Sequence, residues 1–310
     1  MPKISVLMSA YNSEKYIAET INSVLSQTFT DFEFIIINDG STDNTENIIN
    51  SFKDLRIKYY SQTNQGVSKS LNKGLRIATG KYIAKIDSDD ICFKDRLSKQ
   101  YTYMEQNPSC VLCGSYADII DESGAYIYTY SPMPTDNEEI KLKMETQNCF
   151  IHSTSFYRKD MALKIGGYYE PIKQYFEDYM FFYQLVKQGT VYNFSESLIK
   201  YRVSPGAISS RVRNKKYEAL VKNVIHRGFI KDDEKEFLFS FRARKANKKL
   251  QLSNHYLTLS RLVLIYQNDF KRSIKLYIKA IIAKPLNVNI IISGLYLLLI
   301  IIKKKLKITT

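Results

Sequence analysis

Three carboxylates crowd into four residues directly after a strand-like run of the chain. Residues 82–86 are mostly apolar and of strand length, and Asp87, Asp89 and Asp90 follow them. Keeping three neighbouring carboxylates ionised is costly unless a cation neutralises them. Oxygen ligands of this kind suit Mg²⁺ or Mn²⁺. The pattern therefore predicts a metal site, with a solvated acidic loop that caps the next helix as the alternative.

A second acidic group follows another apolar run, at residues 34–37. Asp39 lies there in the tight turn Asn38-Asp39-Gly40-Ser41. A carboxylate in this place can accept an N–H from a nucleobase, and Gly40 allows close approach. A turn or N-cap aspartate is the alternative. Two acidic strand ends in one parallel sheet would form a crevice suited to a nucleotide diphosphate and its metal.

The elements that must position these residues alternate along the chain. Strands are expected at 4–8, 34–37, 56–60 and 82–86, and helices at 17–25, 48–52, 66–78 and 95–107. This alternation predicts an α/β protein with a parallel, doubly wound sheet. Further along we expect an apolar extended segment at 111–114, a helix at 136–145, a strand at 150–157 and an aromatic-rich helix from 176 to about 187.

Charge divides the 310 residues into two regions. Residues 1–210 carry 22 lysine and arginine residues against 25 acidic ones, whereas residues 211–310 carry 23 against 6. We therefore expect a near-neutral domain over 1–210 and a basic helical extension over 211–310. Such an extension suits nucleic acid or anionic lipid, and charge alone does not choose between them.

Several common sites are excluded by their missing motifs. No G-x-G-x-x-G follows the first strand and no G-x-x-x-x-G-K-[ST] occurs, so dinucleotide and P-loop sites are not expected. Diphosphate charge must then be met by a cation and scattered basic residues. Lys69, Lys73 and Lys85 are available, with surface lysines as the alternative.

The four cysteines are expected to be buried free thiols in a reducing, cytoplasmic setting, since they form no disulfide framework and no signal-peptide pattern precedes them.

Five motifs occur in a characteristic order and spacing: residues 5–12 (SVLMSAYN), 38–41 (NDGS), 64–66 (NQG) with Asn72, 87–90 (DSDD) and 177–178 (ED). In this order and spacing they resemble the family-two glycosyltransferases. The resemblance covers about residues 3 to 210. It implies an inverting, nucleotide-sugar-dependent enzyme with a GT-A fold, a Rossmann-like and mostly parallel sheet flanked by helices, here with a helical C-terminal extension.

The resemblance also implies roles for seven residues. Ser9, Tyr11 and Asp39 would hold the nucleobase, Asp87 would lie near the ribose, Asp89 would ligate Mn²⁺ or Mg²⁺ at the diphosphate, and Asp178 would be the acceptor-activating base with Glu177 as the fallback. The chemistry agrees, because a divalent cation stabilises a leaving diphosphate and a carboxylate can activate the attacking hydroxyl. Acidic residues that begin a helix, favoured by its dipole, are the alternative for the last pair.

The chain departs from the family pattern in two places. Leu71 stands where many relatives have an arginine, and Ser204 stands where many have a histidine. Some diphosphate or metal contacts must therefore differ, and Arg202 is a candidate to supply one. His152 either lines the acceptor side or is a structural histidine.

The C-terminal region carries a membrane-like pattern. Residues 270–284 form a basic amphipathic helix, and 285–302 hold no charge over 18 residues before Lys303-Lys304-Lys305. This is just short of the roughly 20 residues a span needs, and both flanks are basic. We expect the segment to lie in an anionic membrane surface. A terminal helix packed on the globular part or on a second subunit, which would give a homodimer, is the alternative.

The resemblance and the basic C-terminal region together imply a metal-dependent hexosyltransferase on the inner face of the cell membrane. By the resemblance, it would move a sugar from a UDP-linked donor to a glycan or polyprenyl-diphosphate-linked acceptor in surface polysaccharide biosynthesis, of the lipopolysaccharide O-antigen or capsule type. Three rivals remain: an aspartyl phosphohydrolase, which lacks the expected hydroxyl residue at Ile91; a basic nucleic-acid-binding protein, which lacks interleaved aromatics; and a catalytically inactive sugar-nucleotide binder.

Overall fold

The computed structural model describes residues 1–131, 133–170, 176–205, 215–240 and 247–305. The chain divides into two compact units. Unit 1 comprises Met1–Asp118, Thr129–Tyr201 and Lys216–Ser240, and unit 2 comprises Ile119–Tyr128, Arg202–Lys215 and Phe241–Thr310. The domain boundary expected at 210/211 lies outside the described residues and stays a prediction.

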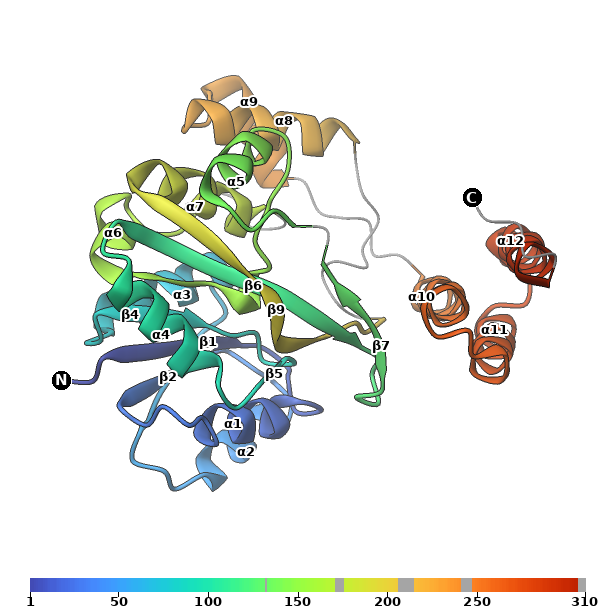
Figure 1. Ribbon diagram of the computed structural model, residues 1–310, viewed down its shortest axis with the longest axis horizontal. Helices are drawn as coiled ribbons and strands as arrows, with labels where there is room; N and C mark the ends of the chain where they lie inside the picture. Colours follow the sequence, from blue (N-terminus) through green and yellow to red (C-terminus); the bar gives the residue numbers. More distant parts are fainter. Residues whose placement is uncertain (132, 171–175, 206–214, 241–246, 306–310) are drawn as a thin grey trace. The chain divides into compact units, whose positions relative to one another are not determined.

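A nine-stranded sheet is present in the described part of the chain, in the order β3-β2-β1-β4-β8-β6-β9-β5, with β7 paired to β6 (Figure 1). The strands are β1 (Ile4–Ala10), β2 (Phe32–Asp39), β3 (Ile57–Gln62), β4 (Tyr82–Lys85), β5 (Ile91–Cys92), β6 (Cys110–Ile120), β7 (Tyr126–Tyr130), β8 (Phe156–Arg158) and β9 (Thr190–Arg202).

The four strands β3, β2, β1 and β4 are parallel, and they carry the expected motifs. In their register Leu7 pairs with Ile35 on one side and with Lys85 on the other. Beyond β4 the pairings of β4 with β8, β6 with β8 and β5 with β9 are antiparallel. The expected α/β class with its mostly parallel, helix-flanked sheet is confirmed.

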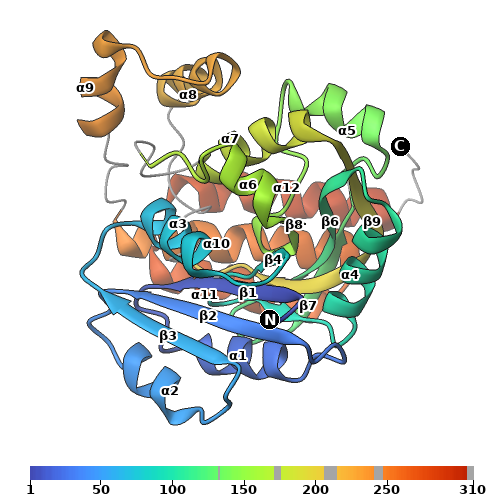
Figure 2. The same ribbon diagram turned by 90° about the vertical axis from the view of Figure 1, so that its left-hand side faces the viewer.

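Helices cover both faces of the parallel strands, as Figure 2 shows. On one face α1 (Ile17–Leu25), α2 (Thr45–Ser51) and α4 (Arg96–Gln106) share one apolar core with alternate residues of β1, β2 and β4. On the other face α3 (Val67–Ile77) lies close, because Gly74 has no side chain: a Cβ there would stand 2.1 Å from Leu7 Cδ1.

The remaining helices follow the antiparallel strands in sequence. They are α5 (Asn137–Met144), α6 (Lys159–Lys164), α7 (Glu177–Leu185), α8 (Lys215–Arg227), α9 (Asp232–Ser240), α10 (Lys248–Leu262), α11 (Phe270–Ala283) and α12 (Val288–Lys305). In unit 2, α10, α11 and α12 pack around Leu257, Ala280 and Ile290. Within the described ranges, no helix is both long and apolar enough to cross a membrane.

One expected strand is wrong over most of its length. Of residues 150–157 only the end belongs to β8, and His152–Thr154 form a 3₁₀ turn instead. Side chains explain the difference, because Thr154 Oγ1 donates to the Ile151 carbonyl (2.9 Å) and Ser155 Oγ to that of His152 (2.8 Å). Such local bonds compete with a sheet ladder. The cysteines, by contrast, are buried free thiols as expected.

Candidate active site

The loops that follow β1, β2 and β4 are joined by hydrogen bonds at one edge of the sheet. Asn12 N donates to Ser41 Oγ (3.0 Å), and Thr42 N donates to Asn12 Oδ1 (2.8 Å). The hydroxyls of Ser13 and Ser88 lie 2.7 Å apart. Parallel strands bring their carboxyl ends together, and these bonds fix the loops there. The expected nucleotide residues therefore lie at one edge of unit 1.

Two of those residues are accessible at this edge. Ser9 lies at the end of β1 and is half-buried, and the Tyr11 side chain is 51% exposed. An exposed tyrosine ring offers a flat apolar surface on which a base can pack. Their role in nucleobase binding stays a prediction.

Asp39 organises the turn that leads into α3. It is buried, and its carboxylate accepts hydrogen bonds from Gln62 Nε2 (2.8 Å), Gln65 N (2.9 Å) and Gly66 N (2.8 Å). Gly40 is required beside it, because its φ is +75° and a Cβ would stand 2.7 Å from a backbone nitrogen. Any contact of Asp39 with a nucleobase would add to this structural role.

Asp87 is held at the end of β4 by two partners. Its carboxylate pairs with the ammonium of Lys85 and accepts a hydrogen bond from Ser153 Oγ (2.9 Å). Burial would raise the pKa of Asp87, but Lys85, together with His152 and the Ser153 hydroxyl, lowers it to about 2. Asp87 is therefore ionised at neutral pH, and its side chain is still 37% exposed.

Lys85 is a buried residue of the site and not a surface lysine. Its side chain is 1% exposed, so the surface-lysine alternative is wrong for this residue, although Lys69 is exposed and Lys73 half-buried. Arg96, also fully buried, donates to the Lys85 carbonyl (2.7 Å) and fixes this end of β4. The site thus has a buried cation of its own beside Asp87.

Asp89 is half-buried and Asp90 is buried in the loop after β4. The described residues contain no cluster of three or more His, Cys, Asp or Glu side chains arranged to hold a metal ion. Mg²⁺ is commonly bound by one or two carboxylates together with substrate phosphates rather than by a cage of protein ligands. The acidic loop fits that kind of site, and the role of Asp89 as the protein ligand stays a prediction.

Glu177 and Asp178 begin α7, directly after Phe176 in the left-handed region (φ 69°). Asp178 accepts a hydrogen bond from Asn148 Nδ2 (2.9 Å) and one from Tyr179 N (2.7 Å). Burial raises the pKa of Asp178 to about 6. Burial, followed by the charge of Asp178, raises the pKa of Glu177 to about 7. A carboxylate whose pKa lies near neutral pH is suited to act as a general base.

The carboxylate pair on α7 and the end of β4 belong to one cluster. The charges of Lys85 and Asp87 both act on the pKa values of Glu177 and Asp178. Although residues 85–87 and 177–178 are about ninety positions apart, the fold gathers them into one site. Sequence reasoning had assigned them separate roles, and the structure shows them as electrostatic neighbours.

His152 is a neutral part of the same cluster. Its Nε2 lies 3.0 Å from the Tyr168 hydroxyl, and burial, followed by the charge of Lys85, lowers its pKa to about 3. This arrangement favours the structural alternative for His152. Sequence reasoning did not find Tyr168, Ser153 or Asn148, because only the folded chain brings them to the site.

Leu71, which replaces the family's arginine, and Arg202, the candidate to supply a missing contact, both lie in the protein interior. Leu71 is fully buried on α3 and belongs to the apolar interior. Arg202 is 2% exposed and donates to the Asp121 carbonyl (3.2 Å), so it is a structural arginine of unit 2. Neither offers a free charge in place of the family's arginine or histidine.

Comparison with known proteins identifies related chains. The family model of glycosyl transferase family 2 matches residues 5–166. An uncharacterized glycosyltransferase of Haemophilus influenzae is 34% identical over 231 residues, 71% of this chain and 72% of its own. Another from Methanocaldococcus jannaschii is 35% identical over 208 residues, 65% of this chain and 71% of its own.

A solved structure shares the fold. The crystal structure of Staphylococcus aureus TarS 1–349 in complex with UDP-GlcNAc has a TM-score of 0.61 to this chain, with 21% identity and 89% of each chain covered. At this level of identity the likeness concerns the fold.

Proposed function

The chain belongs to glycosyl transferase family 2, and from this premise we propose that it transfers a hexose from a UDP-linked donor, with inversion, to a glycan or lipid-linked acceptor. One observation carries the proposal. The acidic end of β4 and the carboxylate pair that begins α7 belong to one cluster. Within it the pKa of Asp87 is lowered, whereas the pKa values of Glu177 and Asp178 are raised. The structurally similar TarS binds UDP-GlcNAc, which supports a UDP-sugar as donor.

The residues of the chain divide the reaction between them. Tyr11 would pack on the base, and Asp89 would hold Mn²⁺ or Mg²⁺, whose positive charge would stabilise the leaving diphosphate. Asp178 accepts the proton of the acceptor hydroxyl, while Asn148 fixes the orientation of its carboxylate. A single in-line attack then inverts the anomeric carbon, so no covalent nucleophile is needed.

A donor screen tests this proposal. The purified protein is incubated with UDP-, GDP- and dTDP-hexoses and Mn²⁺, and release of the nucleoside diphosphate is measured. We expect UDP-hexoses to be hydrolysed fastest and EDTA to stop the release. If no nucleotide sugar is hydrolysed or bound, the proposed function is wrong.

We also propose that unit 2 holds the enzyme on the inner, anionic surface of the cell membrane, where lipid-linked surface-polysaccharide acceptors are found. On α11 two exposed rows run side by side, the isoleucines 274, 278 and 282 and the lysines 271, 275 and 279. Residues four apart lie on one face of a helix, so the rows form an apolar stripe beside a cationic one. This is the surface expected of an interfacial helix.

The next helix extends the apolar surface. Eight exposed apolar side chains lie on α12 and just before it: Leu286, Val288, Ile291, Ile292, Leu295, Leu298, Leu299 and Ile302. Monomeric soluble proteins rarely expose a contiguous apolar patch of such extent. The lysine row is complementary to anionic lipid, which favours a membrane over a second copy of the chain as the partner.

Vesicle co-sedimentation of the full chain tests the membrane proposal. Each lysine near an anionic surface contributes about 1 kcal/mol. Changing Lys271, Lys275 and Lys279 to Gln should therefore weaken binding to phosphatidylglycerol vesicles on the order of a hundredfold. The matched control changes three exposed lysines of unit 1, Lys58, Lys94 and Lys187, and should bind as the wild type does. Equal binding to neutral vesicles, or a stable dimer without lipid, would contradict the proposal.

A further inference from the structure

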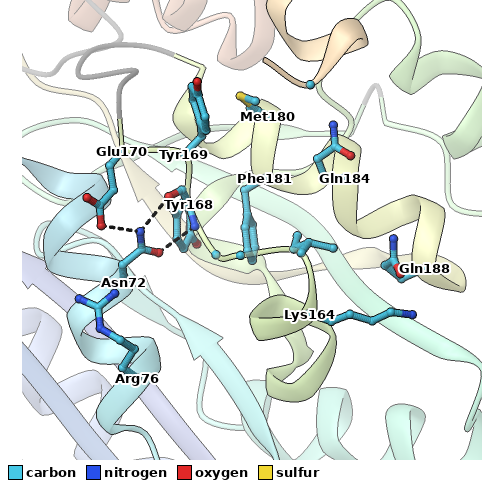
Figure 3. Close-up of a pocket in the computed structure, with 14 residues that line it drawn as sticks. Asn72, Arg76, Lys164, Tyr168, Tyr169, Glu170, Met180, Phe181, Gln184 and Gln188 are labelled. Carbon is cyan, nitrogen blue, oxygen red and sulfur yellow. Dashed lines mark hydrogen bonds between the residues drawn. The ribbon is translucent and has the colours of Figure 1, made fainter. Parts of the chain in front are cut away.

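Unit 1 contains a pocket of about 640 Å³ whose lining includes none of the residues assigned above to donor, metal or base (Figure 3). Its walls come from the second half of α3, the end of α6 with the segment that follows it, and one face of α7, together with Gln188 and Gly228. Figure 3 shows polar side chains around it, with Asn72, Glu170 and Arg76 at the left and Lys164, Gln184 and Gln188 at the right.

The pocket shares a wall with the candidate active site. Asn72 Nδ2 donates to the Tyr168 carbonyl (2.8 Å) and Asn72 Oδ1 accepts from Tyr168 N (2.8 Å), which fixes this part of the lining. The Tyr168 ring stacks on Phe181 with centroids 4.1 Å apart, and its hydroxyl reaches His152. Tyr168 thus lines the pocket and also contacts His152 of the candidate active site.

The α7 wall of the pocket lies on the same helix face as Glu177, the fallback base beside Asp178. Met180, Phe181 and Gln184 lie three, four and seven residues after Glu177, so they share a helix face with it. At a rise of 1.5 Å per residue, Gln184 lies about 10 Å along the axis from Glu177. An acceptor that reaches both the carboxylate pair and the pocket would therefore have to span about this length along α7.

The chemistry of the lining indicates the kind of group that binds. Arg76 and Lys164 are exposed, and in the described part of the chain neither forms an ion pair or side-chain hydrogen bond. The carboxylate of Glu170 already accepts a hydrogen bond from Asn72 Nδ2 (3.0 Å). Two available cations and the amide of Gln188 suit a polyhydroxylated ligand with a negative charge.

We propose that this pocket binds an anionic sugar unit of the acceptor, one that carries a carboxylate or a phosphate. The proposal rests on the transferase function above for the statement that the ligand is an acceptor. The binding itself does not require catalysis, so it can be measured separately.

The test titrates the full chain with methyl glucuronide, glucose 6-phosphate and neutral methyl glucoside, followed by ligand-observed NMR. We expect saturable binding of at least one anionic sugar and weaker binding of the neutral one. The double variant Arg76→Ala/Lys164→Ala should lose at least about tenfold in affinity for the anionic sugar. Lys58→Ala, an exposed lysine of β3, is the matched control and should change nothing.

Donor binding separates this proposal from the proposed function. The double variant should bind UDP as the wild type does, because the two cations lie outside the donor residues. Which anionic sugar binds identifies the charge as carboxylate or phosphate. Equal binding of charged and neutral sugars, or unchanged affinity in the double variant, would overturn the pocket proposal even if the donor screen succeeds. A failed donor screen with intact sugar binding would leave the pocket proposal standing.

Discussion

Replacing Asp178 by asparagine should abolish sugar transfer while UDP affinity stays at the wild-type value. The carboxylate acts on the acceptor hydroxyl, so its loss affects turnover and not donor binding. A general base contributes about 10²- to 10⁴-fold, and we expect kcat to fall by that factor. Asparagine keeps an oxygen that can accept from Asn148 or from Tyr179 N, so the start of α7 should keep its geometry.

The pH dependence of stability shows whether Asp178 is buried as the structure indicates. A carboxyl whose folded pKa is raised contributes stability below its unfolded pKa and loses it as pH rises through the folded value. For Asp178 that window runs from about 4 to about 6. The melting temperature of Asp178→Asn, relative to wild type, should therefore rise between pH 4 and pH 7. A constant difference across this range would argue against a buried carboxyl.

Glu177→Gln provides the matched comparison for the base. If Glu177→Gln loses transfer and Asp178→Asn keeps most of it, the two roles are exchanged. Wild-type transfer should also decline as pH falls below 6 to 7, because the base must be ionised to accept a proton.

The parallel half of the sheet could be predicted because its signals are local. The apolar runs of β1, β2 and β4 have strand length, and the helices between them show regular apolar spacing. Carboxyl ends of parallel strands meet at one edge, so Asp39 and Asp87 could be expected near each other before any coordinates were known.

The interior of the site could not be predicted in the same way. Ser153 reaches Asp87 across 66 positions of sequence, and Tyr168 reaches Asn72 across 96. No local pattern encodes such contacts, because they depend on how β8 and α7 pack against the parallel strands. Lys85 did leave a signal: a lysine within an otherwise apolar strand needs a buried partner. Asp87, two residues later, supplies that partner.

The second large effect is expected at Asp89, where Asp89→Ala should remove the metal-dependent part of UDP binding. Two unit charges 4 Å apart attract by about 4 kcal/mol at an effective dielectric constant of 20. Asp89 is half-buried, so solvent reduces this value, and we expect a loss of affinity on the order of a hundredfold. Calorimetry with UDP, with and without Mn²⁺, measures it.

Two comparisons make the Asp89 result specific. In EDTA the variant and the wild type should bind UDP equally weakly, since the missing carboxylate acts through the cation. Asp31→Ala removes an exposed aspartate just before β2, at the opposite end of that strand from Asp39, and should leave the Mn²⁺ effect unchanged. If Mn²⁺ strengthens UDP binding in Asp89→Ala as much as in wild type, another group holds the metal. If it strengthens neither, the donor diphosphate is neutralised without a metal, and the buried Lys85 becomes the first cation to test.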